Sequence, residues 1–208
     1  MFKNNKIYKI DEKGNRHRIW YCYGLNIKFK GRNSIVELET PLPKYRNCLI
    51  KVGSNCHIKI GASNYHVKNL KIFANADNTK CYIGKDFSLT KGCEILLHKE
   101  NNLYVQIGND CMFASNIVIR TSDVHSLIDL STNKVTNCGG NIDIGNHCWI
   151  AANATVLKNV KIADNCVIGT GSIVTKNCLD DNSIYAGIPA KKIKADINWL
   201  RETPTKIS

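Results

Sequence analysis

One segment of the chain combines a histidine with two carboxylates at the point where a regular pattern is interrupted. Asp123, His125 and Asp129 lie within residues 120–141, which break the six-residue repeat described below. Neutral imidazole titrates near pH 7, so a histidine can accept a proton from a hydroxyl group. One of the two carboxylates, or a backbone carbonyl, could orient its second nitrogen. The segment predicts a general base at His125; the alternative is an ordinary loop histidine.

Other catalytic and metal-binding patterns are missing from the sequence. The chain has six histidines, and no two of them are four or five residues apart. A zinc site built from a close histidine pair is therefore not expected, and we predict no bound metal. The sequence also has no Ser-His-Asp arrangement and no phosphate-binding glycine loop of the Walker type.

The interrupted pattern is a repeat with a period of six residues. Aliphatic side chains occupy every sixth position, at Ile144, Ile150, Val156, Ile162, Ile168 and Val174. This period fits neither an α-helix nor a long strand, and it indicates a solenoid of short strands with one inward aliphatic side chain per face. Three hexads form one coil, so residues about 18 apart should stack. We expect Ile144 to lie over Ile162.

The fifth position of each hexad is small or compact, and many of the ten cysteines lie there. These are Cys56, Cys93, Cys111, Cys148, Cys166 and Cys178. A free cysteine behaves as a small hydrophobic side chain, so we expect the cysteines to point inward and to fill space between coils. Their spacing does not suggest a disulfide framework, and reduced cysteines predict a cytoplasmic protein.

The repeat divides the chain into three expected parts. Residues 1–34 form a hairpin and a lead-in, residues 35–178 form the solenoid with an inserted loop at about 120–141, and residues 179–208 form a cap and a basic tail. A short helix beginning at Asp196 would close the end of the solenoid. No run of about 18 apolar residues is present, so no segment is expected to span a membrane.

The composition indicates a basic globular protein. Hydrophobic residues make up 43% of the chain, and its formal net charge is +12. Such a charge attracts anions, including phosphorylated cofactors and acidic glycans, although a solvated basic surface is an equally good interpretation. No basic run is interleaved with aromatic residues, so nucleic acid is not an expected partner.

Three features resemble the hexapeptide-repeat acyltransferases, and among them the sugar O-acetyltransferases. They are the repeat itself, the His125 segment followed by the segment 149–153 (WIAAN), and the ending 186–194 (AGIPAKKIK). The family ending usually has arginine where Lys194 stands, so a bidentate contact to phosphate is replaced by a point charge. The resemblance covers residues 50–195 and implies an all-β, left-handed parallel β-helix.

The resemblance also implies a function. We expect an acetyl-CoA-dependent O-acetyltransferase that acts on a sugar of a surface glycan, either a capsular polysaccharide or a lipopolysaccharide. Transfer would be direct, with His125 as general base and no acyl-enzyme. Family membership further implies a homotrimer with active sites between adjacent helices.

The resemblance implies positions for the remaining groups of the site. The backbone N–H of Ala152 would stabilise the oxyanion, and Asp123 is the first candidate to orient His125. Trp149 would lie near the acceptor sugar or the pantetheine arm, or would be buried against a neighbouring subunit. The expected coenzyme channel residues are Trp149, Ala152, Thr170, Thr175, Lys191 and Lys194, and Glu94 would bind the acceptor.

Two other functions remain open from the sequence. The first is N-acetylation of an amino sugar or a nucleotide sugar, although the residues before the solenoid are too few for a nucleotide-binding module. The second is a non-catalytic, glycan-binding β-helix, which predicts no binding of coenzyme A. The irregular loop around His125 and the basic tail favour the enzyme.

Overall fold

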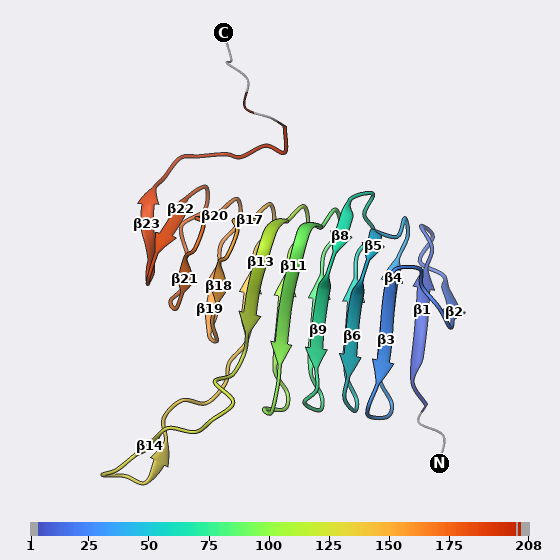
Figure 1. Ribbon diagram of the computed structural model, residues 1–208, viewed down its shortest axis with the longest axis horizontal. Coiled ribbons are helices and arrows are strands. Elements are labelled where there is room, and N and C mark those ends of the chain that lie inside the picture. The colour runs from blue at the N-terminus through green and yellow to red at the C-terminus, as the bar shows by residue number, and fades with distance from the viewer. Residues whose placement is uncertain (1–3, 203, 205–208) are drawn as a thin grey trace.

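The computed structural model describes residues 4–202 and residue 204, which form a left-handed parallel β-helix (Figure 1). Each coil places one strand on each of three flat faces, and equivalent strands of successive coils pair in parallel. The fold predicted from the hexads is therefore confirmed. No helix long and apolar enough to cross a membrane occurs among the residues described.

The first face is an eight-stranded sheet whose outermost strands form the N-terminal hairpin. The hairpin consists of β1 (Lys6–Ile10) and β2 (Arg16–Ile19), as expected, and β1 also pairs with the first coil. The remaining strands are β4 (Ile35–Glu39), β7 (His57–Ile60), β10 (Lys80–Ile83), β12 (Tyr104–Ile107), β16 (Ile142–Ile144) and β19 (Val160–Ile162).

The second and third faces are linked by two long strands that run across both, β11 (Ser88–Leu97) and β13 (Met112–Arg120). The second face also contains β5 (Lys44–Arg46), β8 (His66–Lys68), β17 (Trp149–Ile150), β20 (Val167–Ile168), β22 (Ile184–Gly187) and β23 (Ala190–Lys194). The third face also contains β3 (Leu25–Phe29), β6 (Cys48–Val52), β9 (Leu70–Ala74), β18 (Thr155–Val156) and β21 (Ile173–Val174).

The inward aliphatic residues stack as the repeat predicts. Ile144 pairs with Ile162, Ile150 with Ile168, and Val156 with Val174, and all six are almost completely buried. In the first coils the paired residues lie further apart in the sequence, as Ile60 and Ile83 do, because extra residues bulge at one corner. These longer coils explain why the hexads are visible only in pieces before Ile142.

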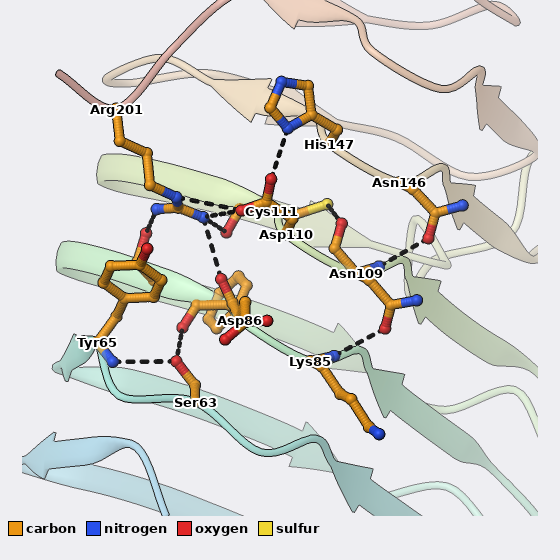
Figure 2. Close-up of polar contacts among 12 residues, drawn as sticks. Ser63, Tyr65, Lys85, Asp86, Asn109, Asp110, Cys111, Asn146, His147 and Arg201 are labelled. Atoms are coloured by element: carbon orange, nitrogen blue, oxygen red, sulfur yellow. Dashed lines mark hydrogen bonds and ion pairs between the residues drawn. The ribbon is translucent and has the colours of Figure 1, made fainter. Parts of the chain in front are cut away.

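Each corner of the solenoid needs a residue that tolerates positive φ, and asparagine or aspartate usually supplies it. At the corner between the first two faces, the side chains also link the coils. The side chain of Asn109 accepts a hydrogen bond from the N–H of Lys85 (2.8 Å), and Asn146 accepts one from the N–H of Asn109 (2.9 Å) (Figure 2). Asp164 continues this ladder by accepting from Asn146 (2.7 Å).

The cysteines are unpaired, and nine of the ten are buried, as the hexads predict. Burial raises the pKa of Cys81 and of Cys178 to about 12, so both remain neutral thiols near pH 7. Cys138 departs from the expectation that the cysteines point inward, because it is exposed in the segment that interrupts the repeat.

The predicted C-terminal helix is wrong. Residues 196–202 run as an extended strap along the solenoid, and Asp196 has a positive φ of 55°. The strap instead finds partners on the coils: the N–H of Ile197 bonds to the carbonyl of Asn182 (2.9 Å), and Asn182 Nδ2 donates to the carbonyl of Ile197 (3.2 Å). So short a segment gains little from helical hydrogen bonds, and its contacts with the solenoid decide its conformation.

We predict that Gly108→Ala destabilises the solenoid by about 1–3 kcal/mol. Glycines at this corner let successive coils approach, and a Cβ at position 108 would lie 2.6 Å from the backbone carbonyl carbon of Gly145. Urea denaturation measures the loss. The neighbouring control Lys85→Ala removes an exposed side chain and should stay within about 0.5 kcal/mol of the wild type. Equal stability of the two variants would contradict the close packing of this corner.

Candidate functional site

The segment that interrupts the repeat forms an arm between β13 and β16, and its two ends are tied together. The N–H of Gly140 bonds to the carbonyl of Thr121 (2.9 Å). The carboxylate of Glu100 accepts bonds from the hydroxyl of Ser122 and from the N–H of Gly139, both at 2.5 Å. These hydrogen bonds close the base of the arm, and we call this bonded base the clasp. Figure 1 shows the arm projecting away from the solenoid.

The tip of the arm is a small hairpin, β14 (Ile128–Asp129) and β15 (Lys134–Val135). The carboxylate of Asp129 stabilises its turn by accepting bonds from Ser131 and Thr132. Several large apolar side chains of the arm face solvent, and Leu130 is 98% exposed. The others are Leu127, Ile128 and Val135. A projecting apolar surface of this kind suits contact with another chain.

His125 lies on the first half of the arm, where its backbone is held and its ring is not. Asn137 Nδ2 donates to the carbonyl of His125 and to Asp123 Oδ2, both at 2.9 Å. Lys158 Nζ binds the same Asp123 oxygen and the carbonyl of Asn137 (2.6 Å). The hydrogen bonds to Asp123 lower its pKa, and the bond from Lys158 has the largest effect. The exposed imidazole of His125 bonds to nothing within the described part of the chain.

The two carboxylates expected to orient His125 have other partners. Asp123 binds Lys158 and Asn137, and Asp129 binds the turn of the hairpin. Among residues 4–202 and 204, neither carboxylate reaches the ring of His125. Lys158 was not expected at the site. Lys158 lies in the coil that follows the arm, at the same corner from which the arm leaves. This place in the repeat was the signal in the sequence.

Ala152 lies at the corner between the second and third faces. Its carbonyl accepts a bond from the N–H of Gly171 in the next coil (2.8 Å), but its own N–H has no acceptor among the described residues. At the ladder corner the corresponding N–H of Asn146 is taken by Asp164. Thr170 occupies the same corner one coil later and is exposed. The amide of Ala152 is thus available to a ligand.

Trp149 lies on β17, close to this corner, and is half-buried. Its Nε1 is buried without a hydrogen-bond partner within the described residues. The indole packs against Trp199 of the C-terminal strap, with ring centroids 6.2 Å apart. The strap of the same chain therefore covers part of the Trp149 ring. From the sequence we expected a sugar, the coenzyme or a neighbouring subunit in this place.

The remaining expected residues lie on β11, on β23 and just after β21. Lys191 and Lys194 are exposed on β23, and no ion pair engages them within the described chain. Thr175 is exposed just after β21. Glu94 lies on β11 and accepts a bond from Lys71 Nζ at 2.8 Å. No hydrogen bond or ion pair joins any of them to His125.

Sequence reasoning missed a cluster on the second face. His147 Nδ1 lies 2.6 Å from Asp110 Oδ2, and its ring stacks on Trp199 with centroids 4.3 Å apart. Arg201 Nε and Nη2 donate to Asp110 Oδ1 at 3.1 and 2.8 Å, and Nη1 donates to Ser88 Oγ at 2.6 Å. Figure 2 shows Arg201 reaching down from the strap to Asp110. This cluster fastens the strap beside Trp149.

One signal of this cluster was present in the sequence. His147 stands at a positive-φ corner (φ 50°), where the equivalent residues of the neighbouring coils are Asp110 and Asn165. Histidine tolerates such a backbone, but an aromatic ring in place of a short polar side chain at this corner indicates a specific stacking partner. That partner, Trp199, lies beyond the end of the repeat, where the hexads carry no information.

Metal-assisted chemistry has no donor set among the described residues. No group of three histidine, cysteine or carboxylate side chains within residues 4–202 and 204 could hold a metal ion. What the chain offers is a free imidazole on the arm, a free backbone amide at Ala152 and unpaired lysines on β23. A base, an oxyanion donor and cations for phosphate are the parts needed for acyl transfer from a coenzyme A thioester.

Comparison with known proteins agrees with this chemistry. Residues 141–176 match the family model "Bacterial transferase hexapeptide (six repeats)". A polysialic acid O-acetyltransferase of Neisseria meningitidis is 32% identical over 169 residues, which cover 75% of this chain and 77% of that protein. A polysialic acid O-acetyltransferase of Escherichia coli O1:K1 is 32% identical over 137 residues. That alignment covers 64% of this chain and only 43% of the E. coli protein.

The fold also resembles a solved enzyme structure. The polySia-specific acetyltransferase NeuO superposes with a TM-score of 0.75 and 29% sequence identity. The superposition covers 88% of this chain and 76% of that one. The similarity therefore extends over most of the solenoid.

We predict that acid releases the strap. Burial alone would raise the pKa of Asp110, but the hydrogen bonds from Arg201 and His147 outweigh it and hold that pKa below its ordinary value of 3.8. The bonds of Arg201 and His147 to Asp110, which anchor the strap, are therefore fully formed above pH 3.8. This anchor is lost as the pH falls through the lowered pKa of Asp110. Tryptophan fluorescence should change in that range, because two of the three tryptophans, Trp149 and Trp199, pack against each other at the strap.

The variant Asp110→Asn tests the cause of this transition. It should show the released fluorescence already at neutral pH while the far-UV circular dichroism of the solenoid is retained. A wild-type acid transition that persists unchanged in Asp110→Asn would contradict the assignment of the anchor to this carboxylate.

Proposed function

Because the chain belongs to the hexapeptide-repeat acyltransferases of the sugar O-acetyltransferase type, we propose that it transfers an acetyl group from acetyl-CoA to a sugar hydroxyl. The proposed acceptor is a sugar of an acidic surface glycan, and the proposed base is His125. Transfer is direct, from the thioester to the hydroxyl, within one ternary complex.

The observation that carries this proposal is the state of His125. Asn137 holds the backbone carbonyl of His125, while its imidazole is exposed and free of protein partners in the described chain. A free neutral imidazole can remove the proton from the attacking hydroxyl and pass it to the departing thiolate of coenzyme A. The histidine stands on an arm whose neck is clasped by Glu100, which limits the positions that the ring can reach.

Ala152 and the unpaired lysines of β23 suit the donor side of the reaction. The unbonded N–H of Ala152 can stabilise the oxyanion of the tetrahedral intermediate, and a backbone donor there requires no particular side chain. The unpaired ammonium groups of Lys191 and Lys194 suit the phosphates of the coenzyme. In this proposal Thr170, Thr175 and Trp149 line the pantetheine channel, and Glu94 meets the acceptor.

We propose that the working form is a homotrimer. The apolar arm has no cover within the described chain, and no bond joins His125 to Ala152, Trp149 or the β23 lysines. A site completed between adjacent solenoids accounts for both observations, since the arm of one copy would bring His125 to the coenzyme channel of the next. The group that orients the imidazole would then come from the assembled trimer.

The acidic acceptor is supported by charge and by the relatives. The net charge of +12 favours an anionic glycan, and two similar proteins are polysialic acid O-acetyltransferases. A covalent route through the buried cysteines is disfavoured, because burial keeps Cys81 and Cys178 as thiols. The ten unpaired cysteines also support a reducing compartment, and we propose the cytoplasm.

We predict that His125→Ala lowers kcat by about 10²–10⁴-fold, because the hydroxyl loses its proton acceptor. Thiol release from acetyl-CoA, measured in the presence of oligosialic acid, gives the rate. Affinity for acetyl-CoA, measured by calorimetry, should change little. The matched control is His66→Ala, which removes an exposed histidine on β8 and should leave the rate unchanged.

Two results would contradict the proposal. Near-wild-type turnover by His125→Ala would remove the proposed base, and a protein that binds no acetyl-CoA would favour a non-catalytic glycan-binding solenoid. Acetylation of an amino sugar faster than of any hydroxyl acceptor would redirect the assignment to N-acetyl transfer.

A further inference from the structure

The positive charge of the chain is concentrated at one end of the solenoid. Residues 1–60 contain thirteen lysines and arginines but only four aspartates and glutamates, a net charge of +9 out of the total of +12. Residues 4–60 form the N-terminal hairpin and the first coils. Figure 1 places this end far from the arm that carries His125. The charge excess is therefore remote from the proposed catalytic base.

Three aromatic side chains are exposed at the same end. Trp20 is 79% exposed, Tyr21 72% and Tyr23 83%, and they lie between the hairpin and β3. Large aromatic rings are usually buried against other groups. A group of exposed aromatic rings marks a binding surface more often than it marks ordinary protein surface. We call Trp20, Tyr21 and Tyr23 the aromatic edge.

The backbone that presents the aromatic edge is held in a tight turn. The N–H of Leu25 bonds to the carbonyl of Cys22 (3.2 Å), so Tyr23 and Gly24 form the middle of the turn. Gly24 has a φ of +74°, and a Cβ there would lie 2.2 Å from the carbonyl oxygen of Tyr45. The turn thus packs closely on the first coil, and it holds Tyr23 outward before any ligand arrives.

A hollow of about 400 Å³ lies beside the aromatic edge. Its walls combine apolar and polar groups: Trp20 and Tyr21 on one side, Asn26 on β3, and Asn47 from the next coil. Since β3 is the last strand of its sheet, its outer backbone groups have no further strand to pair with among the described residues. Sugar hydroxyls could bond to these groups and to the asparagine amides.

Cations lie around this hollow. The guanidinium of Arg18 lies over the Trp20 ring at 4.4 Å from its centroid, and both side chains remain exposed. Lys9 is exposed on β1, the strand whose Ile7 lines the hollow. Neither Arg18 nor Lys9 forms an ion pair within the described residues. The hollow therefore offers ring faces, hydrogen-bonding groups and unpaired positive charge together.

We propose that the aromatic edge and its hollow form a second glycan-binding site, which holds a stretch of acidic polysaccharide away from the catalytic arm. The apolar faces of sugar rings stack on Trp20 and Tyr23, and the sugar carboxylates meet Arg18 and Lys9. The inference rests on the proposed function in that the acceptor is an acidic polymer. A site of this kind keeps the polymer bound while successive residues reach His125.

The positive charge of this end favours an acidic polysaccharide over a second copy of the chain as the bound partner. Another N-terminal end would bring the same net charge of +9 onto the surface, and like charges oppose that contact. A polyanionic strand complements it. Single-stranded RNA is also a polyanion with stackable rings, and the experiment includes it as a competitor.

The test is equilibrium binding of fluorescent oligosialic acid to the full chain without acetyl-CoA. The variant Trp20→Ala/Tyr23→Ala, and separately Lys9→Gln/Arg18→Gln, should each weaken binding about tenfold or more, and wild-type binding should weaken with added salt. The control Lys80→Gln/Lys85→Gln removes the same charge from the first face and its corner and should change binding by less than about twofold.

Each other outcome overturns the proposal. These outcomes are equal binding by wild type and both test variants, equal binding of neutral dextran, displacement of the glycan by RNA at lower concentration, and self-association that depends on the aromatic edge. Because binding is measured without the donor, the two proposals fail separately. A protein that binds oligosialic acid at this edge but transfers no acetyl group loses only the proposed function.

Discussion

The close stacking of coils at the solenoid corners is the constraint on which the rest of the structure depends. Gly108 must lack a side chain because the backbone of the next coil would lie 2.6 Å from its Cβ. The corners turn through positive-φ positions, and the amides of Asn109 and Asn146 are bonded from coil to coil. With the corners set in this way, each face receives one inward aliphatic side chain, and every irregular segment must leave the solenoid at a corner.

The candidate site follows from two departures from this rule. At one corner the chain leaves as the clasped arm that carries His125, and at another the N–H of Ala152 has no acceptor among the described residues, whereas the N–H of Asn146 is bonded to Asp164. Within the described part of one chain, no hydrogen bond or ion pair joins His125 to Ala152 or to the lysines of β23. In the proposed trimer, the solenoid would serve as the frame and the arm would carry His125 to the neighbouring copy.

Much of the fold could be predicted because the hexads report local geometry. The stacking of Ile144 on Ile162 follows from a period of six, and the burial of most cysteines follows from their place in the hexad. The C-terminal strap could not be predicted, because Trp199 and Arg201 meet residues far back in the sequence, and such contacts outweigh a short helix. The clasp at Glu100 was missed for the same reason, whereas Lys158 was missed although its place in the repeat carried a signal. The positions of Trp149 and Lys191 came from resemblance, and their roles remain proposals.

The most direct test of a site shared between copies is complementation in mixed oligomers. His125→Ala removes the proposed base, and Ala152→Pro removes the proposed oxyanion N–H. If the two groups act from different copies, oligomers refolded from both inactive variants should regain a substantial part of the wild-type acetyl transfer to oligosialic acid. Mixed oligomers that form, as shown by co-purification of differently tagged chains, but stay as inactive as either variant alone would contradict the account.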